Sequence, residues 1–369
     1  MTRILRTRKT ANNTTFWAIL LILTALIGIL FYNTPWGYQW RGKSGQWIEV
    51  SSKASLVHVG SHDSFASSQE GIRAGRFVLD FLETKNQQSG KEAIKIYNKL
   101  IPIENYGGEY TALQWFCQYL LATDNQKKQF LSDKYAANFY EFFAENDFAR
   151  LKEYLKRKYK FETYPDQGTT AGENRKAFLE DNILFNNPRR EEWEKTSKII
   201  SAIKIQPGQH IADVGSGPGY YTLKFSQLVG DKGYVYAIDT VKEHLEQLQK
   251  TSKKFGIKNI ETIQTTGTTI GVKANKVDVV FLCSLYHNLY AFSREEEIAS
   301  FVGSIKSAIK KGGRLIVVDN ALVNDSELPY HGPYIAKELI IAQMKYYGFQ
   351  FEKDYAFIPQ RYLLIFKKV

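Results

Sequence analysis

The stretch that decides the fold of this chain is HIADVGSGPG, residues 210–219. A short, mostly apolar run leads into Gly215, Gly217 and Gly219, which are separated by single residues. Glycine lacks a Cβ atom, so such a segment can turn tightly and approach a bound molecule closely. A helical pattern follows from Tyr220, which places the amino end of a helix at the same point. The stretch predicts a strand, a ligand-binding loop and a helix in succession.

The segments that follow repeat this alternation. Apolar runs at 210–214, 234–238, 260–263, 277–283 and 314–318 are separated by helical stretches, which is typical of a parallel sheet with crossover helices. The second run ends in Asp239, about 20 residues past the glycines, where an acid is placed to bind two ribose hydroxyls. We therefore predict a nucleotide-like site, with a purely structural glycine turn as the alternative.

The acid before the loop narrows the choice of nucleotide. Asp213 stands two residues before Gly215, where its carboxylate would repel the pyrophosphate of a dinucleotide. The same charge suits the cationic end of S-adenosylmethionine. The loop also lacks the lysine that a nucleoside triphosphate requires.

These motifs resemble those of the class I S-adenosylmethionine-dependent methyltransferases. The resemblance rests on IADVGSGPGYYT (211–222) followed by VGDKGYVYAID (229–239), and extends over residues 186–369. It is strongest for bacterial small methyltransferases, whose further motifs are matched by Arg190, Trp193 and Lys195, by Leu285–Asn288, and by Pro359, Tyr362 and Phe366. The resemblance implies a Rossmann-like α/β domain with seven strands and S-adenosyl-L-methionine as the cofactor. The residues show no metal-ligand cluster, so we expect no metal.

The resemblance also implies roles for individual residues. The cofactor-binding set is Asp213, Gly215, Gly217 and Gly219 at the methionine part, Asp239 at the ribose, and Thr240 with the 266–268 segment, including Gly267, at the adenine. This chain departs from the pattern where many relatives have an acid at Gly267 or Thr268. Ser284 stands where relatives often have Asp, and Asn288 replaces a second His.

Methyl transfer to an acceptor is an in-line displacement in which the protein mainly positions the reactants. A base is needed only if the acceptor must lose a proton. His287 is the first candidate because it follows the fourth strand, and Tyr286 and His331 are second choices. A structural, hydrogen-bonded His287 is the alternative. Cys283, at the end of an apolar strand, is expected to be a small buried side chain.

Residues 16–32 read FWAILLILTALIGILFY and carry no charge. A helix over them would extend roughly 25 Å, enough to cross a bilayer. A retained anchor, a cleaved signal peptide and a buried helix all compete. The run is longer than a usual signal-peptide core and has no polar face, so we expect a single-pass membrane anchor. Cations on both flanks leave the side of the membrane open.

Between the anchor and the glycine loop the sequence has a helical period. We expect helices at 91–100, 110–122, 127–144 and 148–160, forming an aromatic-rich all-α domain that is either a packed core or a cap for substrate recognition. A basic cluster at 150–160 is a solvated face or a contact for anionic lipid. The predicted organisation is 1–40 tail and transmembrane anchor, 41–66 linker, 67–162 helical domain, 163–185 linker and 186–369 methyltransferase domain.

The composition limits the partners. A net charge of +11 and a pI near 9.2 suit an acidic partner or a lysine-rich solvated surface. Nucleic acid is disfavoured because no motif typical of flipped-base methylation occurs. The two cysteines form no metal or disulfide pattern. We expect a membrane-anchored methyltransferase acting on a small-molecule or lipid-like acceptor; the alternatives are a protein methyltransferase and a binding protein that has lost activity. The sequence leaves the oligomeric state open.

Overall fold

The computed structural model describes residues 38–41, 47–50, 57–58, 68–104, 108–166, 176–321, 334–358 and 361–369. The chain divides into two units, 1–56 and 57–369. In the first unit β1 (Tyr38–Arg41) pairs antiparallel with β2 (Trp47–Val50). The predicted anchor at 16–32 lies outside the described residues. Among the helices that are described, none has the length and apolarity needed to cross a bilayer.

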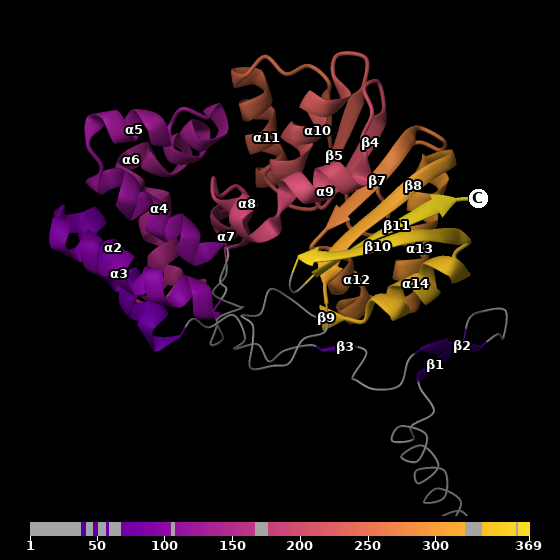
Figure 1. The fold of residues 1–369 in the computed structure, drawn as a ribbon, viewed down its shortest axis with the longest axis horizontal. Coiled ribbons are helices and arrows are strands. Elements are labelled where there is room, and N and C mark those ends of the chain that lie inside the picture. Colours follow the sequence, from indigo (N-terminus) through magenta and orange to yellow (C-terminus); the bar gives the residue numbers. More distant parts are fainter. Residues whose placement is uncertain are drawn as a thin grey trace, which may run out of the picture. The chain divides into compact units, whose positions relative to one another are not determined.

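The second unit begins with β3 (Val57–His58) and a helical region, residues 68–166. Its helices are α2 (Gln69–Thr84), α3 (Gln87–Glu104), α4 (Glu109–Leu121), α5 (Asp124–Phe130) and α6 (Lys134–Lys158) (Figure 1). The aromatic side chains converge in one core, where Phe116 and Phe143 are fully buried and Trp115 stacks on Tyr119. Residues 145–148 of α6 are not helical, so a kink separates the segments predicted as helices at 127–144 and 148–160. The prediction of one helix over 127–144 is wrong, because the chain turns at 131–133 between α5 and α6.

Residues 186–369 form the sheet domain. Its strands are β4 (His210–Val214), β5 (Tyr234–Asp239), β6 (Ile260–Gln264), β7 (Val277–Cys283), β8 (Ile309–Asn320), β10 (Phe349–Ile358) and β11 (Arg361–Lys368). They follow the order β10-β11-β8-β7-β4-β5-β6. Strands β4 to β8 are parallel, whereas β10 and β11 are antiparallel. The strand order reverses between β4 and β7, which is where ligands bind in open α/β sheets.

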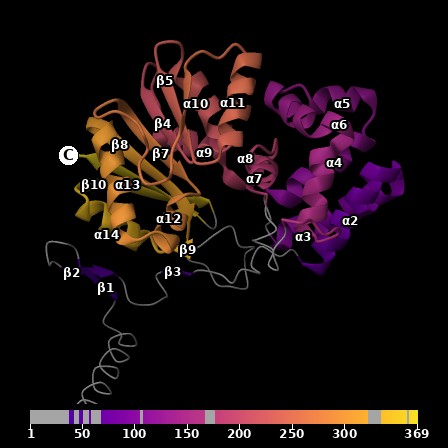
Figure 2. The ribbon, with the colours of Figure 1, turned by 180° about the vertical axis from the view of Figure 1, so that it is seen from behind.

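Helices cover the sheet as the alternating sequence predicts. They are α8 (Arg190–Glu194), α9 (Thr196–Ile203), α10 (Tyr220–Val229), α11 (Lys242–Lys254), α12 (Tyr286–Phe292), α13 (Glu295–Ala308) and α14 (Lys337–Tyr346). Ile199 of α9 and Phe225 of α10 pack with Phe281 and Ile316 on one face of the sheet. The views from front and back agree that α10 and α11 lie beside β4 and β5, and α14 beside β10 (Figures 1 and 2). The short strand β9 (Tyr334–Ile335) pairs with β3.

The segment predicted as a linker at 163–185 contains a helix, α7 (Ala177–Phe185). Leu179 and Ile183 belong to the core of the helical region. On the other side, Asn182 accepts a hydrogen bond of 3.1 Å from Gln247 of α11. Because α7 is covered from two directions, its apolar residues do not follow one stripe, and periodicity alone does not reveal it.

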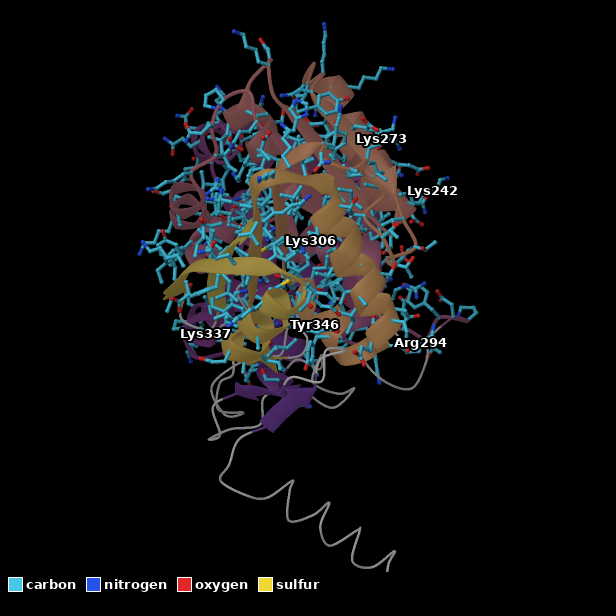
Figure 3. All side chains as sticks on the ribbon, turned by 90° about the vertical axis from the view of Figure 1, so that its right-hand side faces the viewer. Lys242, Lys273, Arg294, Lys306, Lys337 and Tyr346 are labelled. Carbon is cyan, nitrogen blue, oxygen red and sulfur yellow. The ribbon has the colours of Figure 1, made fainter. Side chains whose placement is uncertain are left out.

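The basic cluster predicted at 150–160 is paired with acids. Arg150 lies 2.6 Å from Glu145, and Lys152 lies 2.6 Å from Asp147. Arg157 contacts Glu153 and Asp166, and Lys158 contacts Glu180. On the sheet domain, Lys242, Arg294 and Lys337 likewise pair with acids (Figure 3). Since Arg157 and Lys158 are only 11% and 9% exposed, the pairing favours a partly buried, ion-paired face over a concentrated cationic patch at this helix.

Candidate active site

The glycine loop between β4 and α10 has a backbone that only glycine adopts easily. Gly215, Gly217 and Gly219 have φ angles of +73°, +53° and +101°. A Cβ atom on Gly219 would lie 2.5 Å from Leu248 Cδ1, whereas one on Gly217 would meet no described atom within 4 Å. Gly219 thus packs the loop against α11, and Gly217 leaves open space for a ligand.

Asp239 lies at the end of β5 beside this loop. Its Oδ2 accepts the Gly217 N–H at 2.7 Å, and its Oδ1 accepts the Val241 N–H at 2.8 Å. Burial raises the pKa of this carboxyl, but the hydrogen bond and charge of His244 and the two backbone donors outweigh it and lower the pKa. Asp239 is therefore held as a carboxylate. The donors of Gly217, Val241 and His244 occupy three of its roughly four lone-pair sites, which leaves one on Oδ2 for a ligand hydroxyl.

Asp213 is buried beneath the loop. Thr222 Oγ1 of α10 donates to its Oδ2 at 2.5 Å. Burial raises the pKa of Asp213 to about 7, against the opposing effects of Thr222 and the Arg190 charge. The carboxyl group ties β4 to α10. Its predicted place at the methionine part of the cofactor stays a prediction.

The residues predicted for the adenine side lie together. A Cβ on Gly267 would be 3.6 Å from Thr240 Cγ2. The turn is fixed by a hydrogen bond of 3.3 Å from the Gly267 N–H to Thr265 Oγ1, and the Thr265 N–H donates to the Asp239 carbonyl. The small residues at 266–268 supply hydroxyl groups and no carboxylate here.

His287 follows β7, on the other side of the point where the strand order reverses. Leu285 connects it to the glycine loop, because a Cβ on Gly215 would lie 3.0 Å from Leu285 Cδ2. His287 Nδ1 lies 2.5 Å from Asp319 Oδ1, and the His287 backbone N–H donates to Asp319 Oδ2 at 3.0 Å. Burial raises the pKa of Asp319, but the charge and hydrogen bond of His287 outweigh it and lower the pKa. His287 is 2% exposed. With Nδ1 held by a carboxylate, any proton transfer by this side chain would have to use Nε2.

Sequence reasoning missed Asp319. The available signal was an acid near the end of the fifth apolar run. Tyr286 was predicted as a second catalytic residue, but its hydroxyl donates to Gln343 of α14 in the domain interior. Burial raises the pKa of Tyr286 well above its usual value, which disfavours ionisation. The third choice, His331, lies outside the described residues, as does Pro359.

A buried ionic network lies near the carboxyl end of β7, the same end of the sheet as His287. Glu194 of α8 accepts from Arg190 Nε at 3.0 Å and from an Arg361 nitrogen at 2.6 Å, although Glu194 and Arg361 are 167 residues apart. Burial raises the pKa of Glu194, but the two guanidinium groups outweigh it and hold the pKa at about 2. Arg361 also donates to Ser284, whose φ of +56° is unusual for a residue other than glycine.

Cys283 donates to Glu194 at 3.1 Å and is partly buried. Its environment raises the pKa of the thiol to about 12, mainly through burial, so it stays protonated at neutral pH. The described residues contain no group of three or more His, Cys, Asp or Glu side chains that could hold a metal ion.

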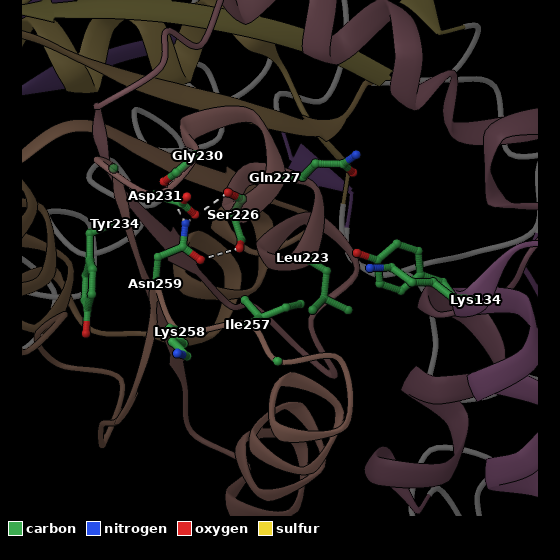
Figure 4. A pocket seen from close by; sticks show the side chains of 13 residues that line it. Lys134, Leu223, Ser226, Gln227, Gly230, Asp231, Tyr234, Ile257, Lys258 and Asn259 are labelled. Carbon is green, nitrogen blue, oxygen red and sulfur yellow. Dashed lines mark hydrogen bonds between the residues drawn. The ribbon is translucent and has the colours of Figure 1, made fainter.

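A cavity of about 710 Å³ lies at the opposite end of the sheet, where β5 and β6 begin (Figure 4). It is lined by the loops at 230–234 and 256–259 and by Lys134 and Tyr135 of α6. Asn259 braces it by donating to the carbonyls of Ser226 and Gly230 at 3.0 Å. These loops precede β5 and β6, whereas the glycine loop and His287 follow β4 and β7. The cavity is therefore separate from the candidate active site.

Comparison with known proteins assigns the sheet domain. Residues 205–356 match the family model described as a methyltransferase domain. The C-terminal half of this chain is a methyltransferase domain. It is 27% identical over 175 residues to a probable cobalt-precorrin-6B C(15)-methyltransferase (decarboxylating) of Sulfolobus acidocaldarius, covering 45% of this chain and 82% of that protein. A protein-L-isoaspartate O-methyltransferase of Methanococcus aeolicus is 24% identical over 127 residues, or 34% of this chain and 53% of that protein.

Among solved structures, the methyltransferase domain is similar to an S-adenosylmethionine-dependent methyltransferase from Aquifex aeolicus. That similarity has a TM-score of 0.44 and 25% identity, and covers 49% of this chain and 94% of the other. The family match and the relatives identify the protein as a methyltransferase, with S-adenosylmethionine as the implied cofactor of the methyltransferase domain.

Proposed function

We propose that this chain is a membrane-anchored S-adenosylmethionine-dependent methyltransferase that methylates a small-molecule or lipid-like acceptor. The observation that carries the proposal is the meeting of two sites at the switch point of the sheet. The glycine loop with Asp239 lies after β4 and β5, and the His287–Asp319 pair lies after β7 and near the end of β8. One side supports cofactor binding and the other supports work on an acceptor.

The loop residues fit the cofactor. The open space beside Gly217 allows close approach of a ligand to the backbone, and Asp239 Oδ2 has a lone pair left for a ribose hydroxyl. Thr240 and the 266–268 turn form a neighbouring surface of small side chains for the adenine ring. When bound, the cofactor supplies an electrophilic methyl group. The protein then positions the acceptor in line with it.

His287 and Asp319 define what the acceptor side can do. Because Asp319 holds Nδ1, we assign His287 Nε2 to take a proton from the acceptor as the acceptor forms its bond to the methyl group. Asp319 then stabilises the resulting imidazolium. A hydroxyl, amine or carbon acid has such a proton to give, whereas a carboxylate acceptor needs no base.

The membrane anchor is proposed from sequence alone, on the uncharged run at 16–32. Such an anchor would hold the methyltransferase domain close to lipid and lipid-soluble molecules.

The test is to incubate a membrane extract with the full chain and methyl-tritiated S-adenosylmethionine. Label in the small-molecule or lipid fraction, lost with Asp239→Ala, is the expected result. Label in protein would instead establish a protein methyltransferase. Cofactor binding without any transfer to the three fractions would favour a protein that has lost activity.

A further inference from the structure

A buried histidine lies behind the cofactor-binding carboxylate. His244 is on the first turn of α11 and is 1% exposed. Its Nδ1 lies 3.4 Å from Asp239 Oδ1, and its Nε2 lies 3.5 Å from Asp181 Oδ2. Asp239 belongs to the cofactor site, whereas Asp181 belongs to α7, which precedes the methyltransferase domain. The imidazole thus lies between two carboxylates from different parts of the fold, hydrogen-bonded to Asp239 and at an ion-pair distance from Asp181.

The contact with Asp239 bears on cofactor binding. The backbone donors of Gly217 and Val241 hold one oxygen each, and His244 is the side chain that faces Oδ1 as well. A carboxylate that must present its remaining lone pair to a ribose hydroxyl gains from having its rotation fixed before the ligand arrives. Replacing the imidazole would loosen the carboxylate on the side away from the ligand.

A role in packing alone does not account for this histidine. Its Nε2 is buried, makes no hydrogen bond to a described residue and is directed to the Asp181 carboxylate at 3.5 Å. Burying an imidazole nitrogen without a hydrogen bond costs free energy that leucine would avoid. The surrounding contacts also connect the same two helices: Gln247, one turn along α11, donates to Asn182 of α7, and the Phe178 ring lies 5.8 Å from the imidazole.

We propose that His244 is a positioning residue that couples α7 to the ribose-binding carboxylate Asp239. Since Leu179 and Ile183 of α7 belong to the core of the helical region, that region takes part in setting cofactor affinity through this imidazole. The inference rests on the proposed cofactor role of Asp239. It gives the helical region a function at the cofactor site in addition to any role in acceptor recognition.

The test is isothermal titration calorimetry of the full chain with S-adenosyl-L-homocysteine. Loss of a hydrogen bond to a charged group predicts that His244→Leu raises Kd about tenfold or more. His244→Gln, which keeps a donor, should recover most of that loss, and Asp181→Asn should raise Kd about threefold. His210→Gln is the matched control, because His210 begins β4 and lies at the end of that strand away from the glycine loop. The Kd of this variant for S-adenosyl-L-homocysteine should not change.

A second ligand separates positioning from general damage to the fold. The 2′,3′-dideoxy analogue of S-adenosyl-L-homocysteine has no ribose hydroxyls for Asp239 to bind. His244→Leu should therefore change its Kd less than twofold, and should add little in an Asp239→Asn background. Equal losses for both ligands, or an unchanged Kd for S-adenosyl-L-homocysteine, would overturn the inference. If the wild-type chain binds neither ligand, the proposed function itself is wrong.

Discussion

Replacing Asp319 by asparagine should slow methyl transfer while leaving cofactor binding intact. The Asp319 carboxylate is fully buried and contacts His287 twice, at Nδ1 and at the backbone N–H. Asparagine keeps the shape but removes the charge that stabilises an imidazolium. A hydrogen bond to a charged group contributes about 1.5–3 kcal/mol, so we expect the rate to fall about 10- to 100-fold.

The magnitude for His287→Ala is larger. General acid–base catalysis contributes roughly 10²- to 10⁴-fold, so removal of the base should slow transfer to that extent. The assay is the initial rate of tritium transfer to the labelled acceptor fraction at saturating cofactor, with Kd measured separately by calorimetry. Asp278→Asn is a matched control, since Asp278 lies at the other end of β7 and pairs with Lys310.

Two results would refute this reasoning. An unchanged rate in Asp319→Asn and His287→Ala would show that the acceptor needs no base. A loss of cofactor affinity as large as the loss of rate would show that the pair supports the cofactor site and does not act on the acceptor.

Three other substitutions test the site. Gly219→Ala should destabilise the domain by roughly 1–3 kcal/mol in chemical unfolding, because the added Cβ would lie 2.5 Å from Leu248 and φ is +101°; stability equal to wild type would contradict the assigned packing. Asp213→Asn should stabilise the chain at pH 8 more than at pH 5. The pKa of Asp213 in the folded state, about 7, lies above the ordinary value near 4. The wild-type carboxyl therefore favours the native state most at low pH, and the free energy of unfolding falls by up to about 4 kcal/mol as the pH rises through 7. The same gain in melting temperature at both pH values would show that Asp213 does not titrate this way. Glu194→Gln should cost about 3–5 kcal/mol, because it leaves Arg190 and Arg361 without their buried counter-charge; a loss below 1 kcal/mol would mean that the network is not essential.

The parts of the fold that local sequence encodes were predictable. The parallel strands, the glycine loop and Asp239 follow from apolar runs, spacing and turn chemistry within about 30 consecutive residues. The boundary within α6 was also visible in the sequence. The seven-stranded order confirms the predicted Rossmann-like sheet, and the family match confirms the methyltransferase domain.

Contacts between distant residues were not predictable. Asp319 lies 32 residues from His287, and nothing local shows that β7 and β8 bring them together. Arg361 meets Glu194 because the last strand returns to β8, and His244 meets Asp181 because α7 packs on α11. The surroundings of Tyr286 were not predictable either: its neighbour in sequence, His287, contacts Asp319, whereas the Tyr286 hydroxyl donates to Gln343 of α14.

The central claim is that the glycine loop and Asp239 bind the cofactor, and calorimetric titration with S-adenosylmethionine tests it most directly. The wild-type chain should bind at one site. Asp239→Ala should weaken binding about 10- to 100-fold, since it removes a charged acceptor whose hydrogen bond to a ribose hydroxyl contributes about 1.5–3 kcal/mol. The absence of binding heat in the wild type, or an equal Kd in Asp239→Ala, would contradict the account.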